Sequence, residues 1–196
     1  GFDQYFQQYY QYTRTIWGKL FSVSALSQGS FRPDSQMSFY GIDTLFSIEA
    51  FRQAKRIGIL AESLHKYYMS PQSVSYHFDA HRFRSDQVLF DRAYQYLIDK
   101  CGNVRTQNYC FLLLVYMNAI KDTIRVLLES KISSTDKLNY LYKICSDQRT
   151  KRLNQASFPQ MVSERQKLYT QVSEWIYRQQ IVRGKTGMEI AADILA

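Results

Sequence analysis

Apolar residues recur at steps of three and four positions along most of this chain, and that spacing places them on one face of an α-helix. The segment at about 104–131 is apolar on all sides in its middle, which is typical of a buried helix. The 196 residues include only three Pro and eight Gly, whereas sandwiches and barrels need frequent turn signals. The sequence therefore predicts an all-α, single-domain bundle of six or seven helices around a buried central helix at about 104–131.

Capping residues and breaks in the apolar spacing give the expected bounds of the other helices. A first, aromatic helix is expected within 2–28, where it is a candidate for a protruding element. Gly58 would lie inside a second helix at a cost of about 1 kcal/mol, so we expect another backbone to pack against it. No composition shift marks a second domain within 1–196. The further helices are expected at 43–68, 85–101, 133–145, 160–181 and 186–196, and the longer connections at 29–41, 71–84 and 146–159.

Positive charge is concentrated in one part of the chain. The formal net charge is +8. Residues 1–130 carry 14 Lys and Arg against 11 Asp and Glu, whereas residues 131–185 carry 11 against four. Residues 186–196 contain two acidic residues and no basic one. A basic excess gathered in 131–185 is what an interface for an anionic partner requires.

The basic segment is interleaved with tyrosines, and this combination suits nucleic acid. Lys and Arg neutralise phosphates and release counterions, and Tyr can stack on an unpaired base. The candidate nucleic-acid-binding residues are Lys143, Arg149, Lys151, Arg152, Arg165, Lys167, Arg178, Arg183 and Lys185, extended by Arg82 and Arg84. The leading hypothesis is non-enzymatic binding of DNA or RNA by a helical subunit or accessory factor. Sequence selectivity should be weak, because phosphate contacts carry no base information.

Two alternatives stay open beside that hypothesis. The basic segment can be an ordinary solvated surface whose tyrosines are half-buried by helix packing. The protein can also be an adaptor or structural subunit of a larger assembly, or a homo-oligomer, that binds through its N-terminal helix. Tyr10, Tyr12 and Trp17 lie off the apolar stripe of that helix, and Tyr and Trp are favoured anchors of protein interfaces.

No complete catalytic or cofactor motif is present, so we expect a protein that is not an enzyme and needs no cofactor. Gly184–Thr186 lacks the earlier Gly and the preceding strand of a phosphate-binding loop. His77 and His81 would share one face of a helix, but no Glu follows His77 and the neighbouring arginines disfavour a cation. No His follows an Arg at the spacing used by helical nucleases. We therefore assign no metal ligands.

The cysteine pattern favours a reducing compartment. Cys101, Cys110 and Cys145 form an odd number with no paired spacing, which argues against a disulfide framework. The sequence shows no charged-then-apolar leader at its start. The longest apolar run, 109–117, is far shorter than the roughly 20 residues of a membrane span. The expectation is a cytoplasmic protein with no membrane partner.

Overall fold

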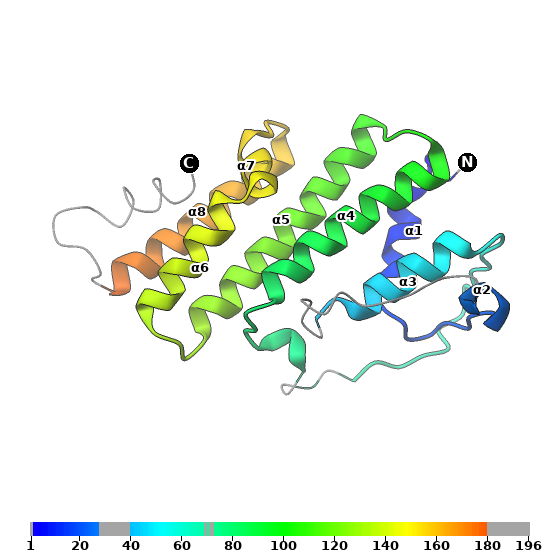
Figure 1. Ribbon diagram of the computed structural model, residues 1–196, viewed down its shortest axis with the longest axis horizontal. Coiled ribbons are helices and arrows are strands. Elements are labelled where there is room, and N and C mark those ends of the chain that lie inside the picture. Colours follow the sequence, from blue (N-terminus) through cyan, green and yellow to red (C-terminus); the bar gives the residue numbers. More distant parts are fainter. Residues whose placement is uncertain (1, 28–39, 69, 71–72, 180–196) are drawn as a thin grey trace. The chain divides into compact units, whose positions relative to one another are not determined.

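The computed structural model describes residues 2–27, 40–68, 70 and 73–179 (Figure 1). Within these ranges the backbone forms α-helices and one short 3-10 helix, Val74–Tyr76, and contains no strand. The predicted all-α class is therefore confirmed. The helix expected at 186–196 and the Gly184–Thr186 motif lie outside the described residues.

The chain divides into two compact units, residues 1–112 and residues 113–196, and the division falls inside one long helix. Each unit is therefore described by itself. The single-domain organisation and the central position of the helix at 104–131 stay predictions. In chain order, the helices of the described residues are α1 (Phe6–Thr13), α2 (Val23–Ser27), α3 (Ile42–Gln53), α4 (Arg82–Cys101), α5 (Thr106–Glu129), α6 (Ser134–Ser146), α7 (Gln148–Gln155) and α8 (Pro159–Gln179).

In the first unit, α3 packs along α4, and Figure 1 shows the two helices side by side. Leu45 and Val88 are buried between them, with Leu89 packed against the pair. Gly41 precedes α3 with a φ of 88°, in the left-handed region that glycine tolerates best. A Cβ at Gly41 would lie 2.6 Å from Leu89 Cδ1, so a side chain at this position would require the end of the Leu89 side chain to shift.

Aromatic packing fixes α1 in the first unit. Phe6 and Tyr10 are buried, and the ring of Phe111 meets both of them edge-on, with centroids 6.1 and 5.6 Å away. The prediction that Tyr10 lies off the buried stripe is wrong. Its side chain is buried, because it packs against the Phe111 ring. The helix is also shorter than expected, since it ends at Thr13, whose hydroxyl donates to the Tyr10 carbonyl at 2.7 Å.

The predicted helix at 43–68 is wrong beyond Gln53. Ala54 has extended backbone angles, and residues 55–68 are exposed and form no helix. Among the described residues, nothing lies within 4 Å of a Cβ built on Gly58, so none of them makes the expected close approach of a backbone. Apolar spacing alone does not hold a helix in water, because most helical stability in proteins comes from packing the apolar face. The segment 54–68 has no such packing in the described part of the chain.

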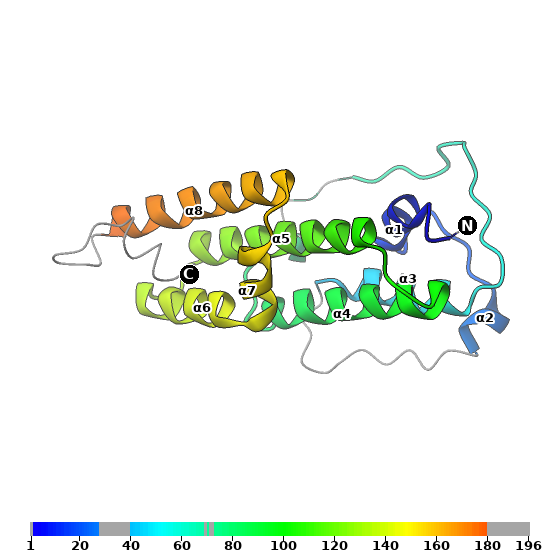
Figure 2. The same ribbon diagram turned by 90° about the horizontal axis from the view of Figure 1, so that it is seen from above.

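In the second unit, the C-terminal part of α5 joins α6 and α8, which Figure 2 shows as neighbouring helices. Lys137 of α6 donates to the Leu128 carbonyl at the end of α5 at 2.7 Å, and its Nζ lies 5.9 Å from the ring centre of Trp175 on α8. Lys121 of α5 forms an ion pair with Glu164 of α8. Lys137 thus satisfies an otherwise open carbonyl at the end of a helix, where a cation is favoured.

Candidate nucleic-acid interface

The corner between α6 and α7 carries the most accessible part of the predicted basic segment. Ser133 caps α6 by accepting from the Asp136 backbone N–H at 3.1 Å, as its spacing predicts. Asp147 alone separates α6 from α7, and its carboxylate accepts from the backbone N–H groups of Arg149 and Thr150 at 2.9 and 3.4 Å. A single capping residue therefore ends one helix and starts the next.

The helix α7 corrects the prediction that 146–159 is only a connection. Thr150 and Leu153 are buried and hold the helix against its unit. The physical reason is the Asp147 cap together with these two inward side chains three positions apart. The opposite side of α7 consists of exposed polar residues at positions i, i+3, i+4 and i+7, namely Gln148, Lys151, Arg152 and Gln155.

The last turns of α6 add an aromatic ring and a further cation. Tyr142 is 70% exposed, and the neighbouring Lys143 is exposed, with its Nζ 6.0 Å from the ring centre of Tyr140. Among the described residues, no carboxylate lies within ion-pair distance of Lys143, Lys151 or Arg152. We define the α6–α7 basic surface as Tyr142, Lys143, Gln148, Lys151, Arg152 and Gln155. Three accessible cations, two amides and one ring are groups that contact phosphates and bases.

Three other predicted residues make contacts within the protein. Lys167 forms an ion pair with Glu164 at 2.6 Å, and Arg149 lies 3.8 Å from the Asp147 carboxylate. Arg165 is partly buried and donates to the Ala156 carbonyl at 3.3 Å. Hydrogen bonds from Lys121 and Lys167 lower the pKa of Glu164. These cations are already engaged by groups of the second unit, so we leave them outside the α6–α7 basic surface.

Arg82 and Arg84 belong to the first unit, on α4. The Arg82 side chain is fully buried: its guanidinium carbon lies 3.8 Å from the ring centre of Tyr40, and Nη1 donates to the Ser75 carbonyl at 3.1 Å. A side chain enclosed in this way does not reach a phosphate, and the prediction that Arg82 extends the interface is not supported. Arg84 is partly buried in the same helix.

The remaining predicted residues are near or beyond the end of the described chain. Arg178 lies in the last turn of α8, where the structure does not describe its side chain, and Arg183 and Lys185 lie outside the described residues. Tyr142 is one of the tyrosines that interleave the predicted basic segment, whereas the sequence pattern did not single out Gln148 and Gln155 of the α6–α7 basic surface. The signal that would have found these two glutamines is Asp147 as a helix cap, followed by inward residues three positions apart.

In the described ranges, the histidines and cysteines do not come together in a catalytic or metal-binding cluster. His81 Nδ1 lies 3.4 Å from Asp79 Oδ1, and both side chains are exposed, as is His77. No group of three His, Cys, Asp or Glu side chains in the described part of the chain could hold a metal ion. Burial raises the pKa of the Cys145 thiol to about 12, so it stays protonated at neutral pH.

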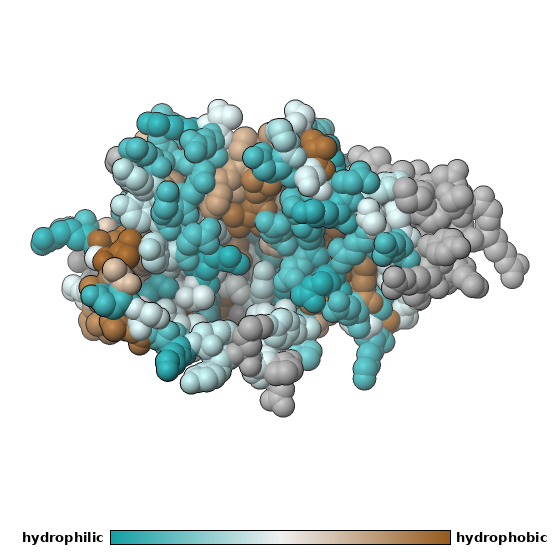
Figure 3. All heavy atoms as spheres, turned by 180° about the vertical axis from the view of Figure 1, so that it is seen from behind, coloured by the Kyte–Doolittle hydropathy of each residue, from teal (hydrophilic) through white to brown (hydrophobic). Residues whose placement is uncertain are grey.

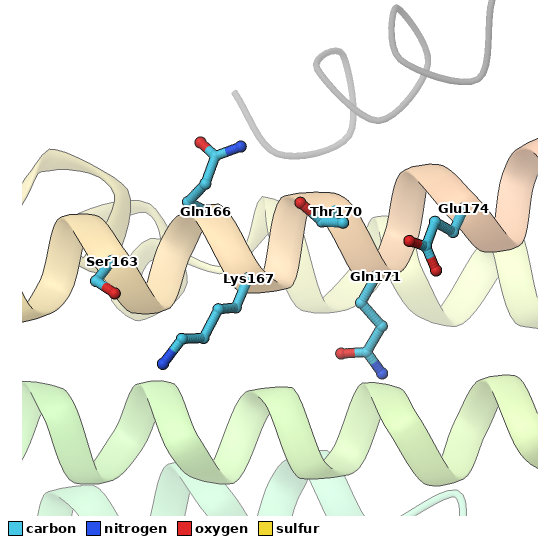
Figure 4. Close-up of a pocket in the computed structure, with 6 residues that line it drawn as sticks. All are labelled: Ser163, Gln166, Lys167, Thr170, Gln171 and Glu174. Atoms are coloured by element: carbon cyan, nitrogen blue, oxygen red, sulfur yellow. The ribbon is translucent and has the colours of Figure 1, made fainter.

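A shallow hollow runs along α8 (Figure 4). Its described lining residues are Ser163, Gln166, Lys167, Thr170, Gln171 and Glu174. All of them come from one helix, and Figure 4 shows that their side chains do not converge on a common point. The described lining residues therefore do not supply the convergent polar groups that orient a small molecule.

The comparisons with known proteins add no relative. No protein-family model, curated protein or solved structure matches this chain. None of the helices within the described residues is long and apolar enough to cross a membrane. The described residues thus form an all-α fold, and in the second unit Lys143, Lys151 and Arg152 are exposed with no ion-pair partner among those residues.

Proposed function

We propose that the protein binds nucleic acid without catalysing a reaction, through the α6–α7 basic surface. The observation that supports this most directly is the exposed side of α7, where Lys151 and Arg152 lie between Gln148 and Gln155 with no acidic partner among the described residues. An ion pair would have to be broken before a cation could bind phosphate. Lys151 and Arg152 need no such step.

The residues around these two cations suit a nucleic-acid backbone better than a carboxylate of a protein partner. The amides of Gln148 and Gln155 donate and accept, as sugar and base edges require. Tyr142 exposes most of its ring, and base stacking on an exposed aromatic ring is tolerant of sequence. We therefore expect a preference for single strands, whose bases are accessible, over duplexes.

The test is binding to a labelled single strand and a labelled duplex of the same sequence at two or more salt concentrations. Three phosphate contacts give a slope of log K against log salt of about −2 for a single strand and about −3 for a duplex. The variant with Lys151→Gln and Arg152→Gln should lose about two thirds of that slope.

Lys167→Gln is the matched control, because Lys167 is basic and exposed in the same unit but is paired with Glu164. It should leave the slope almost unchanged. If neither nucleic acid binds at low salt, or if the double variant binds like the wild type, the α6–α7 basic surface is an ordinary solvated surface.

An adaptor role through the N-terminal helix is the second candidate function. Tyr12 and Trp17 remain exposed, which favours it, whereas Tyr10 and Phe6 are buried within the first unit. One side of α1 is therefore occupied by its own fold, whereas Tyr5, at 48% exposure, and the exposed Gln8 and Gln11 remain accessible to a partner together with Tyr12. Measurement of the oligomeric state at rising protein concentration tests the homo-oligomer form of this proposal.

A further inference from the structure

Exposed apolar side chains of the first unit gather where two segments of the chain meet. A Cβ on Gly18 would lie 3.4 Å from the Cβ of His65, so segments 14–23 and 54–68 are in contact there. Figure 3 shows hydrophobic residues at the end of this unit where Figure 1 places α2. We define the apolar patch as Trp17, Leu20, Val23, Leu60, Leu64 and Tyr67, each of which is more than half exposed.

The exposure of segment 14–23 is part of the fold. The carbonyls of Arg14 and Thr15 accept from the hydroxyls of Thr44 and Ser47 on α3, at 3.0 and 2.9 Å. Further along, the Phe21 ring meets Phe46 of α3 edge-on at 5.2 Å. The backbone is thus attached to α3 on both sides of Trp17 and Leu20, while those two side chains face solvent, at 52% and 103% exposure.

The charges around the patch have one dominant sign. Segments 14–23 and 54–68 together contain five basic residues and one acidic residue, Glu62. Arg14, Lys55, Arg56 and Lys66 are exposed. A surface that combines apolar side chains with an excess of cations is complementary to one that combines hydrocarbon with anions. The interfacial region of a bilayer with anionic lipids has both.

We propose that this apolar patch docks the first unit onto the surface of a membrane that contains anionic lipids. A lipid surface fits better than the groove of a helix-binding protein, because the patch comes from irregular backbone. Steps of three and four positions, such as those from Leu60 to Tyr67, align side chains on one face only in a helix, and residues 55–68 form none. An interface of lipids needs no such alignment. Trp17 and Tyr67 also belong to the residue types favoured at the boundary between membrane and water.

The sequence predicted no membrane partner, because no apolar run is long enough to cross a bilayer. Docking onto the surface needs no crossing helix. The prediction also assumed that the apolar residues of 57–68 belong to a packed helix, and the structure leaves them exposed.

The experiment uses the full chain and vesicles of phosphatidylcholine, either alone or mixed with phosphatidylserine. The chain has two tryptophans, so Trp175→Phe leaves Trp17 as the only tryptophan, and excitation at the red edge of the absorption band selects it over the 16 tyrosines. With the mixed vesicles, we expect the protein to co-sediment, the Trp17 emission to shift to the blue, and acrylamide to quench it less. Phosphatidylcholine alone should give much weaker binding.

Leu20→Glu and Leu64→Glu should each weaken binding to the mixed vesicles by about tenfold, because a carboxylate replaces an inserted apolar group. Val162→Glu makes the same charge change at an exposed apolar residue of α8 and should bind like the wild type. The three positions are exposed, so the variants should keep the helical content of the wild type by circular dichroism.

Three results would overturn the proposal. The first is no co-sedimentation with the mixed vesicles. The second is co-sedimentation with an unchanged Trp17 emission, which would mean that the basic residues bind the vesicles without the patch. The third is equal loss of binding in Val162→Glu and Leu20→Glu. Self-association that Leu20→Glu abolishes, without vesicle binding, would assign the patch to a protein partner instead.

Discussion

At the scale of single residues, Gly41 and Gly102 allow two effects of a glycine to be compared: tolerance of a left-handed backbone and space for a neighbouring side chain. Both have positive φ, 88° and 74°, but only Gly41 faces a close neighbour, Leu89. Replacement of either by Ala should cost about 1–2 kcal/mol for the left-handed backbone. Gly41→Ala should cost up to about 1 kcal/mol more, because the Leu89 Cδ1 methyl has to rotate away and this partly buried side chain packs against Leu45 and Val88. Urea denaturation of the two variants measures the difference in the free energy of unfolding.

Leu89→Ala supplies the control for that comparison. In this background the crowding at Gly41 is removed, so Gly41→Ala should cost no more than Gly102→Ala. Equal losses from the two glycine variants in the wild-type background would show that Leu89 adapts at no cost.

The buried thiol of Cys145 gives a prediction about alkaline pH. Its pKa rises from 9.0 in the unfolded chain to about 12 in the folded protein, because burial disfavours the thiolate. The folded state therefore holds a proton that the unfolded state releases above pH 9. The associated stability is fully present below pH 9 and is lost between pH 9 and about 12, by up to about 1.4 kcal/mol per pH unit.

Urea denaturation at several pH values should show a shallower alkaline decline for Cys145→Ala than for the wild type. The slopes are compared rather than the absolute stabilities, since the variant also loses packing. Tyr10, whose pKa burial raises to about 12, contributes to the decline in both proteins. Parallel curves would show that Cys145 is accessible to ionisation in the folded state.

At the scale of elements, the nucleic-acid proposal depends on α7 being a helix, and Asp147 tests this. Asp147→Ala removes the acceptor for two backbone N–H groups and should lower the free energy of unfolding by about 1 kcal/mol. Asp147→Asn removes the same negative charge but keeps a capping oxygen. Both variants should gain equally from the lost charge, so Asp147→Ala should bind a labelled single strand more weakly than Asp147→Asn. Equal affinities would mean that binding does not need the helical arrangement of Lys151 and Arg152.

The elements also show which parts of the fold the sequence can predict. The helices expected at 104–131 and 133–145 correspond to α5, Thr106–Glu129, and α6, Ser134–Ser146, because local spacing and a Ser133 cap act together there. The predicted helix at 43–68 had comparable spacing in 54–68 but no surface to pack on. The helix α7 shows that packing can hold a helix that apolar spacing does not predict. It has few apolar residues, but Thr150 and Leu153 pack into the second unit.

The candidate site follows the same division between local and distant causes. Composition alone located the basic excess in 131–185. The Glu164–Lys167 pair could have been predicted from its spacing of three on a helix, which would have removed Lys167 from the interface. The burial of Arg82 against Tyr40 could not have been predicted in this way, because it depends on two residues that are far apart in the chain.

At the scale of the whole molecule, the two proposed surfaces lie on different compact units and should act independently. One variant, Lys151→Gln with Arg152→Gln, changes the α6–α7 basic surface, and the other, Leu20→Glu with Leu64→Glu, changes the apolar patch. Both lower the formal net charge of +8 by the same two units. A partner attracted only by overall charge would therefore respond equally to the two variants.

The expected result is a crossed pattern. The first variant should lose most of its salt-dependent affinity for a labelled single strand, with a slope that is smaller by about 1.4. It should keep the blue shift of Trp17 with vesicles that contain phosphatidylserine. The second variant should bind the single strand like the wild type and lose the blue shift. Equal losses in both assays would mean that net charge, rather than the two surfaces, governs binding, because only the positions of the changes differ between the variants.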